Sequence, residues 1–219
     1  EQRIAALGEC LTTFKQLMTE RANLPPKNDL ISMLAHSSMV NMDDQQFLST
    51  LILLIIGGND TTRNSISGGL LALIENPEEF AKLRENPILV NSLVPEIIRW
   101  QTPLTHMRRT TTKEVEVSGV TIPAGAKVVM WYLSGNRDEQ AIENPDQFII
   151  DRKNPRHHLS FGFGIHRCVG NRLAEMQIRV LWEEILSRNL TFELAGEPQR
   201  TLSNVIHGIN TMPLRVTRP

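Results

Sequence analysis

The sequence contains only two cysteines, Cys10 and Cys168, which lie far apart in very different contexts. This number excludes the disulfide framework on which small secreted domains depend. A reducing compartment suits such a chain, so we expect a cytoplasmic protein. The sequence also lacks a Cys-x-x-Cys pair, which argues against a structural zinc site.

Long apolar runs and an excess of either charge are missing as well. The most apolar run, Leu51–Ile56, has six residues, whereas a helix needs about 20 to cross a bilayer. The chain has 23 Lys and Arg against 24 Asp and Glu, and its net charge is −1. This balance favours neither nucleic acid nor an acidic membrane surface as a partner. We therefore expect no membrane span and no nucleic-acid partner.

The 219 residues show no repeat, no low-complexity segment and no linker, so we expect a single domain over residues 1–219. The sequence starts at Glu1 without an initiator Met or a signal-peptide pattern, just before an amphipathic helical stretch. We therefore expect this domain to be partial, with its N-terminal part absent.

Hydrophobic periodicity predicts a mainly α chain with small β-sheets, of the α+β class. One predicted helix, residues 45–74, is unusually long, and its apolar centre, Leu51–Ile56, indicates burial on every side. A proline- and charge-rich meander, residues 136–156, leads to the loop that holds Cys168. The other predicted helices are 29–36, 77–84, 89–100 and 171–188, and the predicted strands include 115–117, 120–122, 127–131, 191–194 and 213–216.

Cys168 lies in a glycine-punctuated loop, Phe161 to Gly170, directly before a predicted helix. Backbone N–H groups of the loop and of the helix N-terminus favour a thiolate over a thiol at this position. The ring of Phe161, seven residues upstream, can shield the sulfur from water. A shielded thiolate is an iron ligand, whereas the ordinary alternative for a cysteine beside a helix is an inert small hydrophobe.

A second motif, Gly57-Gly58-Asn59-Asp60-Thr61-Thr62, interrupts the long predicted helix. Two glycines inside a helix cost about 1 kcal/mol each relative to alanine. Either a close crossing of two helices or the room needed by a bound diatomic ligand explains them. In the second case Asp60 can relay protons. The Thr61 hydroxyl can then bond the oxygen, or bond back to the helix and open it locally.

Glu96 and Arg99 stand three residues apart on one predicted helix. On most helices this spacing gives a surface ion pair worth only about 0.2–0.5 kcal/mol. Pro95 directly precedes Glu96 and should kink the helix, unless the helix starts later and Pro95 belongs to a turn before it.

Together these motifs resemble the cytochrome P-450 superfamily. Residues 161–170 match its haem-ligand loop, Phe-x-x-Gly-x-x-x-Cys-x-Gly, and residues 57–62 match its Ala/Gly-Gly-x-Asp/Glu-Thr-Thr/Ser helix. Glu96 and Arg99 match its Glu-x-x-Arg pair. The resemblance covers essentially the whole chain and corresponds to about the C-terminal half of a soluble, bacterial-type member. It implies the helix-rich C-terminal half of that fold, with small β-sheets, and haem b as the cofactor.

The resemblance also implies a role for each matched residue. Cys168 is the implied metal ligand, whose thiolate pushes electron density onto haem iron, and Asp60 and Thr61 are the implied catalytic residues that deliver protons. Arg152, in the meander, is the implied third member of a buried ion cluster with Glu96 and Arg99. The implied haem-binding residues are Gly58, Arg109, Phe161, Gly164, His166 and Gly170.

Arg109 and His166 are the implied partners of the haem propionates. Arg108 competes with Arg109 for this role. Without the family, Arg109 is equally well explained as a solvated strand charge, and His166 as an ordinary loop histidine.

The implied activity is that of a monooxygenase, which inserts one atom of O₂ into a C–H bond with electrons from NAD(P)H. The implied partners are a ferredoxin and a ferredoxin reductase. Arg167, Arg172 and Arg179 could form a basic patch for an acidic ferredoxin, although a solvated helix face explains them as well.

Substrate contacts in the family fall on two segments that are mostly apolar here, which suits a small hydrocarbon-like substrate: Leu104, Thr105 and His106, and Val205 and Ile206. The sequences of residues 57–64 and 157–160 are similar to those of bacterial terminal hydroxylases of alkanes and fatty acids. The alternatives are a sterol side-chain or branched-lipid hydroxylase and, from another class, a haem-binding protein without turnover.

Overall fold

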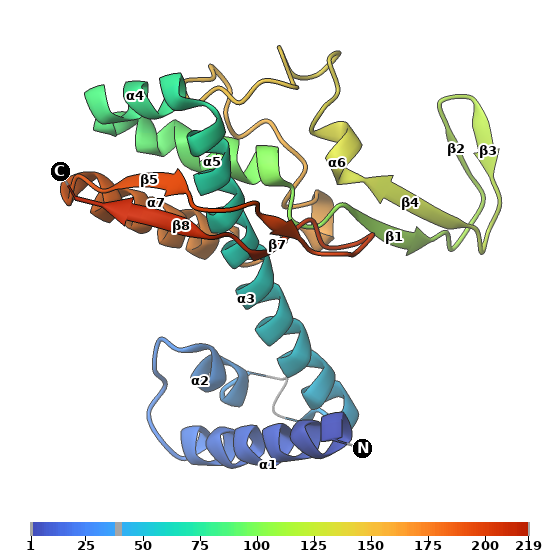
Figure 1. Ribbon diagram of the computed structural model, residues 1–219. Coiled ribbons are helices and arrows are strands. Elements are labelled where there is room, and N and C mark those ends of the chain that lie inside the picture. The colour runs from blue at the N-terminus through green and yellow to red at the C-terminus, as the bar shows by residue number, and fades with distance from the viewer. Residues whose placement is uncertain (1, 38–40, 219) are drawn as a thin grey trace. The chain divides into compact units, whose positions relative to one another are not determined.

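The computed structural model describes residues 2–37 and 41–218. Its internal contacts divide the chain into two compact units, Glu1–Gly57 and Gly58–Pro219. Figure 1 shows the helices and strands of both. The expectation of one partial domain over residues 1–219 stays a prediction. Within the described residues, no helix is long and apolar enough to cross a membrane.

The first unit contains α1 (Gln2–Ala22), α2 (Leu30–Ala35) and the start of α3 (Asp44–Glu75). Asp29 caps α2, because its side chain accepts a hydrogen bond from the Ser32 N–H at 2.8 Å. Its small core consists of Met18, Leu34, Ala35, Phe47 and Leu51.

The predicted burial of the α3 centre on every side is wrong. Leu51 is buried, but Leu53 and Ile56 are 70% and 59% exposed. A helix is buried all round only where other segments surround it, and among the described residues the small core packs against one side of this stretch.

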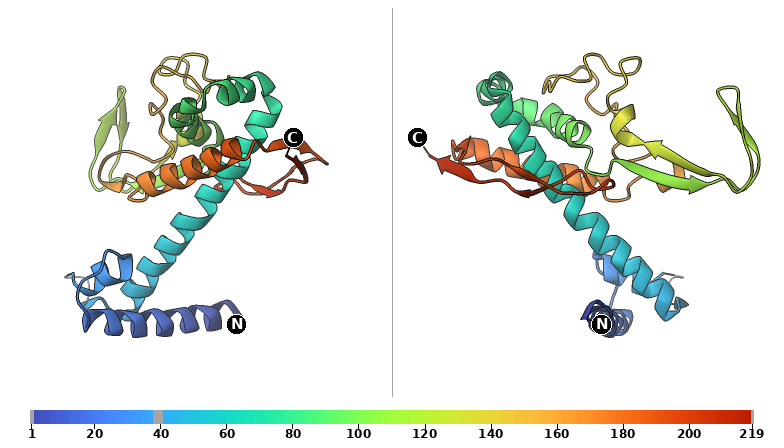
Figure 2. Two further views of the ribbon diagram at one scale, coloured as in Figure 1. Left: turned by 90° about the vertical axis from the view of Figure 1, so that its left-hand side faces the viewer. Right: turned by 45° about the vertical axis from the view of Figure 1, so that its right-hand side comes forward.

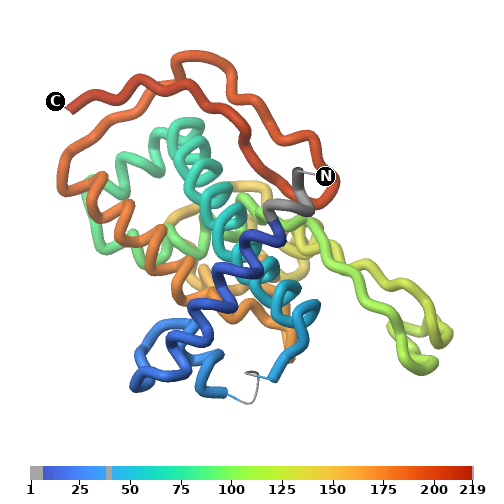
Figure 3. The backbone as a smooth tube through the Cα atoms, turned by 90° about the horizontal axis from the view of Figure 1, so that it is seen from below, coloured from blue at the N-terminus to red at the C-terminus, as the bar shows by residue number. Residues whose placement is uncertain are grey.

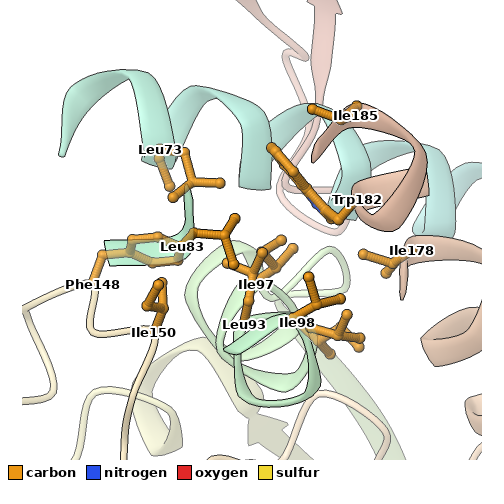
Figure 4. Close-up of a cluster of buried hydrophobic side chains, with 13 residues drawn as sticks. Leu73, Leu83, Leu93, Ile97, Ile98, Phe148, Ile150, Ile178, Trp182 and Ile185 are labelled. Carbon is orange, nitrogen blue, oxygen red and sulfur yellow. The ribbon is translucent and has the colours of Figure 1, made fainter. Parts of the chain in front are cut away.

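The main core lies in the second unit, where α3, α5 and α7 meet the meander. The helices of this unit are the rest of α3, α4 (Pro77–Glu85), the short 3₁₀ turn η2 (Pro87–Leu89), α5 (Val90–Gln101) and α7 (Asn171–Ser187), close to the predicted ranges. Figure 4 shows side chains from these elements packed together, among them Leu73, Ile97, Ile150 and Trp182, all nearly inaccessible to solvent. The core therefore fixes α7, the helix directly after the Cys168 loop, against α5.

Proline Pro95 lies inside α5 and is buried. Because the helix begins at Val90, five residues earlier, the alternative that Pro95 belongs to a turn before the helix is excluded. Helix α5 ends at Thr102, whose φ of 41° is left-handed.

Within the described residues, the strands form four two-stranded antiparallel sheets, which agrees with the small β-sheets expected. Strand β1 (His106–Thr110) pairs with β4 (Lys127–Trp131), and β2 (Val115–Val117) pairs with β3 (Val120–Ile122) at the far end of the same ribbon (Figure 2). A turn at residues 123–125 joins β3 to β4, with Gly125 at φ 79°. A short helix that the sequence did not indicate, α6 (Tyr132–Gly135), follows β4.

The C-terminal segment forms a second ribbon, red in Figure 3. Strand β5 (Thr191–Leu194) pairs with β8 (Leu214–Thr217), as the predicted strands suggested. Between them β6 (Gln199–Arg200) pairs with β7 (Ile209–Thr211), which periodicity did not reveal because these strands are so short. The predicted fold class, mainly α with small sheets, is confirmed.

The meander has no regular structure, but it is firmly packed. Phe148 and Ile150 enter the main core, and the Ile150 N–H donates to the Glu79 carboxylate of α4 at 2.8 Å. Lys82 bridges Glu79 at 2.6 Å and Asp151 at 3.1 Å. An irregular segment satisfies its backbone groups in this way because it has no helix or sheet partner to do so.

Candidate functional site

Three charged side chains form a buried cluster between α5 and the meander. The side chains of Glu96, Arg99 and Arg152 are 0%, 1% and 8% exposed. Arg99 donates through Nε and Nη2 to both carboxylate oxygens of Glu96, at 2.8 Å each, and Arg152 Nε donates to Glu96 Oε2 at 3.0 Å. The structure therefore brings together the three residues expected to form this cluster, and it excludes the surface pair that helical spacing alone suggests.

The remaining donors of the two arginines hold the meander backbone. Arg99 donates to the carbonyls of Asn136 and Pro145 at 2.8 Å and of Gln147 at 3.0 Å. Arg152 donates to carbonyls at residues 143, 144 and 147. Buried charges are tolerated only when each is paired and hydrogen-bonded, and this cluster meets that condition.

Backbone hydrogen bonds close the Cys168 loop on itself. The Gly162 N–H donates to the Leu159 carbonyl at 2.7 Å, and the Cys168 N–H donates to the Phe161 carbonyl at 2.8 Å. Between them the short turn η3 (Gly164–His166) changes the chain direction. Gly162 and Gly164 have φ of 67° and 71°, a conformation that glycine adopts without strain. The sequence thus dictates the path of the loop through its glycines.

The side chains of the loop that surround Cys168 point outward. Cys168 itself is exposed, and the apolar side chains of Phe163, Ile165 and Val169 are 85%, 96% and 91% exposed. Phe161 packs against the main core instead. The expected shielding of the sulfur by the Phe161 ring is therefore not seen, because the ring lies against the core while the sulfur is exposed.

Two of the three glycines of the loop, Gly164 and Gly170, have open space beside the backbone. A Cβ added at Gly164 or Gly170 would meet no atom within 4 Å. Together with the exposed apolar side chains, this gives a thiol beside an uncovered, non-polar backbone surface. Contiguous exposed apolar groups of this kind mark a binding site.

Helix α3 is unbroken through the Gly57–Thr62 motif, so the local opening that Thr61 could produce is absent. Asp60 is exposed and pairs with Arg63 at 3.1 Å. The space beside Gly58 is open, which argues against a close helix crossing there. The room at Gly58 therefore agrees with the ligand explanation of this glycine.

The close crossing of α3 occurs about three turns further along, at Gly68 and Gly69. A Cβ at Gly68 would lie 1.9 Å from Gln101 Oε1, and one at Gly69 would lie 2.6 Å from Ile97. Sequence reasoning missed this pair, although the signal, two adjacent glycines in a helix, is the same as at Gly57 and Gly58.

Arg109 and His166 lie on different elements, β1 and η3. Arg109 is half-buried opposite Val128, and its Nη1 donates to the Arg108 carbonyl at 3.0 Å. Neighbouring strand residues face opposite sides, so Arg108 and Arg109 cannot both serve one ligand. Among the described residues, neither Arg109 nor His166 is in an ion pair with a carboxylate. Both can therefore accept an anionic partner.

The structure brings the two expected substrate segments side by side. Leu104 and Ile206 form an isolated antiparallel bridge, and the Thr105 N–H donates to the Val205 carbonyl at 2.9 Å. The His106 ring lies 4.5 Å from that of Trp131, centroid to centroid. Two segments about 100 positions apart in the sequence therefore lie next to each other.

Sequence reasoning missed the polar residues that support this place. Asn64 of α3 is 2% exposed, and its Oδ1 accepts from the Ile209 N–H at 3.3 Å. Gln101 Nε2 donates to the His207 carbonyl at 2.6 Å, while His207 Nδ1 donates to the Gln101 carbonyl at 2.5 Å. Burial lowers the pKa of His207, which favours the neutral ring. No sequence pattern marks such pairs, because they join segments far apart in the chain.

His158 is a further residue that the pattern did not single out. Its Nδ1 is buried without a hydrogen-bond partner among the described residues, and its ring lies 5.6 Å from that of Phe161. Burial, with Arg167 and Arg99 as the nearest positive charges, lowers its pKa to about 4. His158 is therefore neutral at physiological pH.

Comparison with known proteins assigns the chain to a family. The family model "Cytochrome P450" matches residues 4–213. The chain belongs to the cytochrome P450 family. It is 38% identical over 215 residues to linalool 8-monooxygenase of Pseudomonas putida, covering 97% of this chain and 52% of the relative. It is 40% identical over 205 residues to a methyl-branched lipid omega-hydroxylase of Mycobacterium bovis, covering 92% and 48%.

The fold agrees with this family. Cytochrome P450-153 from Novosphingobium aromaticivorans matches with a TM-score of 0.92 and 46% identity, over 99% of this chain and 54% of that one. The chain thus spans about half the length of the P450 relatives it matches. The expected cytochrome P450 fold is confirmed, while the expectation that the chain is the C-terminal part of that fold stays a prediction.

Haem is the cofactor that the P450 family implies, and the residues present fit it. An exposed thiol is the donor that a haem-thiolate iron takes. The open backbone at Gly164 and Gly170 and the uncovered side chains of Phe163 and Val169 suit a flat apolar macrocycle. Arg109 can offer its charge to a carboxylate of the ring.

Proposed function

We propose that the protein is a haem-dependent P450 monooxygenase that inserts one atom of O₂ into a C–H bond of an apolar substrate. The observation that carries the proposal is Cys168, which is exposed in a loop that also exposes the apolar side chains of Phe163, Ile165 and Val169. The relatives whose names give an activity are monooxygenases or hydroxylases.

The bound haem supplies the oxygen chemistry, in which one oxygen atom enters the substrate and the other leaves as water with two electrons and two protons. Cys168 would hold the iron, and the glycines at 164 and 170 would let the loop backbone approach the ring. Arg109 and His166 would bind the propionates. Asp60, exposed on α3, would take protons from solvent, and the Thr61 hydroxyl would pass them on. The pairing of Asp60 with Arg63 keeps the carboxylate on the helix surface, where water reaches it.

The proposed substrate is an alkane or fatty acid hydroxylated at its terminal carbon. Leu104 and Ile206, brought together by the bridge between their segments, give an apolar contact for such a chain. The lipid omega-hydroxylase among the relatives acts, by its name, on a terminal position. A sterol side chain or a branched lipid is the alternative substrate within the same class.

The proposed electron donors are a ferredoxin and its NAD(P)H-dependent reductase, in the cytoplasm. Arg172 and Arg179 on α7 are partly neutralised by Glu175 at 3.1 Å and Glu183 at 3.8 Å. Arg167 has no ion-pair partner among the described residues. The basic surface for an acidic partner is therefore centred on Arg167, next to the proposed iron ligand.

The ligand assignment is tested by the absorption spectrum of the reduced protein under CO. We expect the red-shifted band of a thiolate-ligated ferrous haem, its loss in Cys168→Ala and its retention in the matched control Cys10→Ala. A band that survives Cys168→Ala overturns the assignment.

Turnover is tested with a ferredoxin, its reductase, NADH and a panel of alkanes, fatty acids and sterols. We expect a terminal alcohol from the first two classes. Oxygenated sterols alone would favour the alternative substrate. Haem binding with no oxygenated product from any substrate would favour a haem-binding protein without turnover.

A further inference from the structure

A hydrogen-bond network around Asn136 joins the ion cluster to the Cys168 loop. Asn136 is the first residue after α6 and is fully buried. Its Nδ2 donates to Thr102 Oγ1 and Ser160 Oγ, at 2.8 Å each, and its Oδ1 accepts from the Leu159 N–H at 2.6 Å. Its own carbonyl accepts from Arg99 Nη1 at 2.8 Å.

The two hydroxyls of this network fix the orientation of the Asn136 amide. Thr102 Oγ1 donates to the Arg99 carbonyl at 2.6 Å, and Ser160 Oγ donates to the Ile98 carbonyl at 2.8 Å. Each hydroxyl has one proton, and both protons are used on α5 carbonyls, so both oxygens must accept from Asn136. Leu159 offers only an N–H and needs an acceptor. A flipped amide would therefore break all three bonds.

The network continues into the loop through the backbone. Leu159 and Ser160, both held by Asn136, directly precede Phe161, whose carbonyl accepts from the Cys168 N–H at 2.8 Å. The Leu159 carbonyl accepts from the Gly162 N–H at 2.7 Å. A shift at residues 159 and 160 therefore moves the acceptor that holds Cys168.

We infer that Asn136 is a positioning residue for the proposed iron ligand, which sets the place of Cys168 relative to α5 through Leu159 and Ser160. The inference rests on the proposed role of Cys168. The ion cluster fixes the meander, but its described hydrogen bonds end on residues 136–149. Asn136 carries that anchorage to the loop, because its carbonyl bonds Arg99 while its side chain bonds residues 159 and 160.

Hydrogen exchange in the chain itself tests the inference without haem. In Asn136→Leu we expect the Gly162 and Cys168 amides to exchange at least tenfold faster, over and above the change in core amides such as that of Ile178. The matched control is Leu73→Ala, which opens a cavity in the main core and should accelerate loop and core amides by one common factor. A common factor in both variants would overturn the inference.

A second variant keeps the test decisive if Asn136→Leu does not fold. Ser160→Ala removes one partner of Asn136 and leaves the ion cluster intact. We expect faster exchange at Gly162 and Cys168 in this variant too, by a smaller factor. Where both single variants fold, their effects on the Cys168 amide should not combine independently, because both act through one network. Unchanged loop exchange in Ser160→Ala, or independent effects, would contradict the inference.

The CO spectrum of the haem-loaded protein separates this inference from the proposed function. We expect Asn136→Leu to lose much of the thiolate-type band that Leu73→Ala retains. If Cys168→Ala keeps the band, the proposed ligand is wrong. If Cys168→Ala loses it and Asn136→Leu changes neither the band nor the loop exchange, only the positioning role fails.

Discussion

The Cys168 loop, taken together with the three residues that lead into it, has two regions that differ sharply in how they are held. Its base, residues 158–162, is tied by the Asn136 side chain, the Ser160 hydroxyl and the packing of Phe161 on the core. Its tip, residues 163–169, exposes three large apolar side chains and the Cys168 thiol. The base is thus held by side-chain hydrogen bonds and by core packing. Among the described interactions, the tip is held only by backbone hydrogen bonds and by the left-handed conformation of one glycine. A loop built in this way can hold its shape before a ligand binds.

We expect the largest loss of stability from a substitution in the buried ion cluster. Glu96→Ala leaves Arg99 and Arg152 buried without a carboxylate, so we expect the free energy of unfolding to fall by about 3–5 kcal/mol in urea titrations. The matched control is Glu184→Ala, which breaks an exposed pair with Arg188 and should cost less than about 0.5 kcal/mol. Equal small losses would mean that the base does not depend on the cluster.

The next largest effect is expected at His158, which should make the stability of the chain depend on pH. Its pKa in the folded chain is about 4, below the usual value of about 6.5 in an unfolded chain. Between these pH values the unfolded state binds the proton more tightly. Stability is therefore complete above about pH 6.5 and is lost as pH falls towards 4, by up to about 3 kcal/mol. Urea midpoints over this range should fall less steeply in His158→Leu than in the native chain. Parallel curves would exclude His158 as the source.

Alanine at two glycine positions, Gly164 in the tip and Gly58 in α3, should change the free energy of unfolding in opposite directions. Gly164→Ala forces a left-handed φ on a residue with a Cβ and should cost about 1 kcal/mol. Gly58→Ala fills open space inside a helix and should stabilise by up to about 1 kcal/mol. Thermal unfolding of both variants measures the signs. A stabilising Gly164→Ala would show that the tip adapts its path freely.

The smallest effect on stability is expected at the tip. Ile165→Ser and Val169→Ser alter nearly fully exposed side chains and should change the free energy of unfolding by less than about 0.5 kcal/mol. Haem affinity of the same variants, measured by titration, should fall, because the proposed site loses apolar contact. Unchanged affinity together with a large loss of stability would reverse the assignment of base and tip.

The sequence predicted the local features of this site well. Glycine spacing and the periods of helices and strands are local signals, so the Cys168 loop and the helix that follows it, α7, could be placed without a structure. The ion cluster was also named residue by residue, because the family resemblance supplied the third member, Arg152. Spacing alone would have left Glu96 and Arg99 on the surface.

The long-range features could not be predicted. Asn136 is an ordinary polar residue in a meander, and only the fold shows that it meets Thr102 and Ser160 in the core. The prediction that the α3 centre is buried on every side was wrong for a related reason. An apolar stretch indicates that burial is favourable but not which segment covers it. The exposed Leu53 and Ile56 belong to a chain that spans about half the length of its P450 relatives.

The left-handed end of α5 shows what the network demands of the chain. Helices commonly end in this conformation with glycine, which adopts it freely, whereas a residue with a Cβ loses about 1–2 kcal/mol. Thr102 occupies the position at φ 41°, fully buried, and its hydroxyl is one of the two that orient Asn136. A protein engineer who relieved the strain with glycine would remove that hydroxyl as well. The substitution would stabilise the backbone at residue 102 but would loosen the hydrogen bonds that position the Cys168 sulfur.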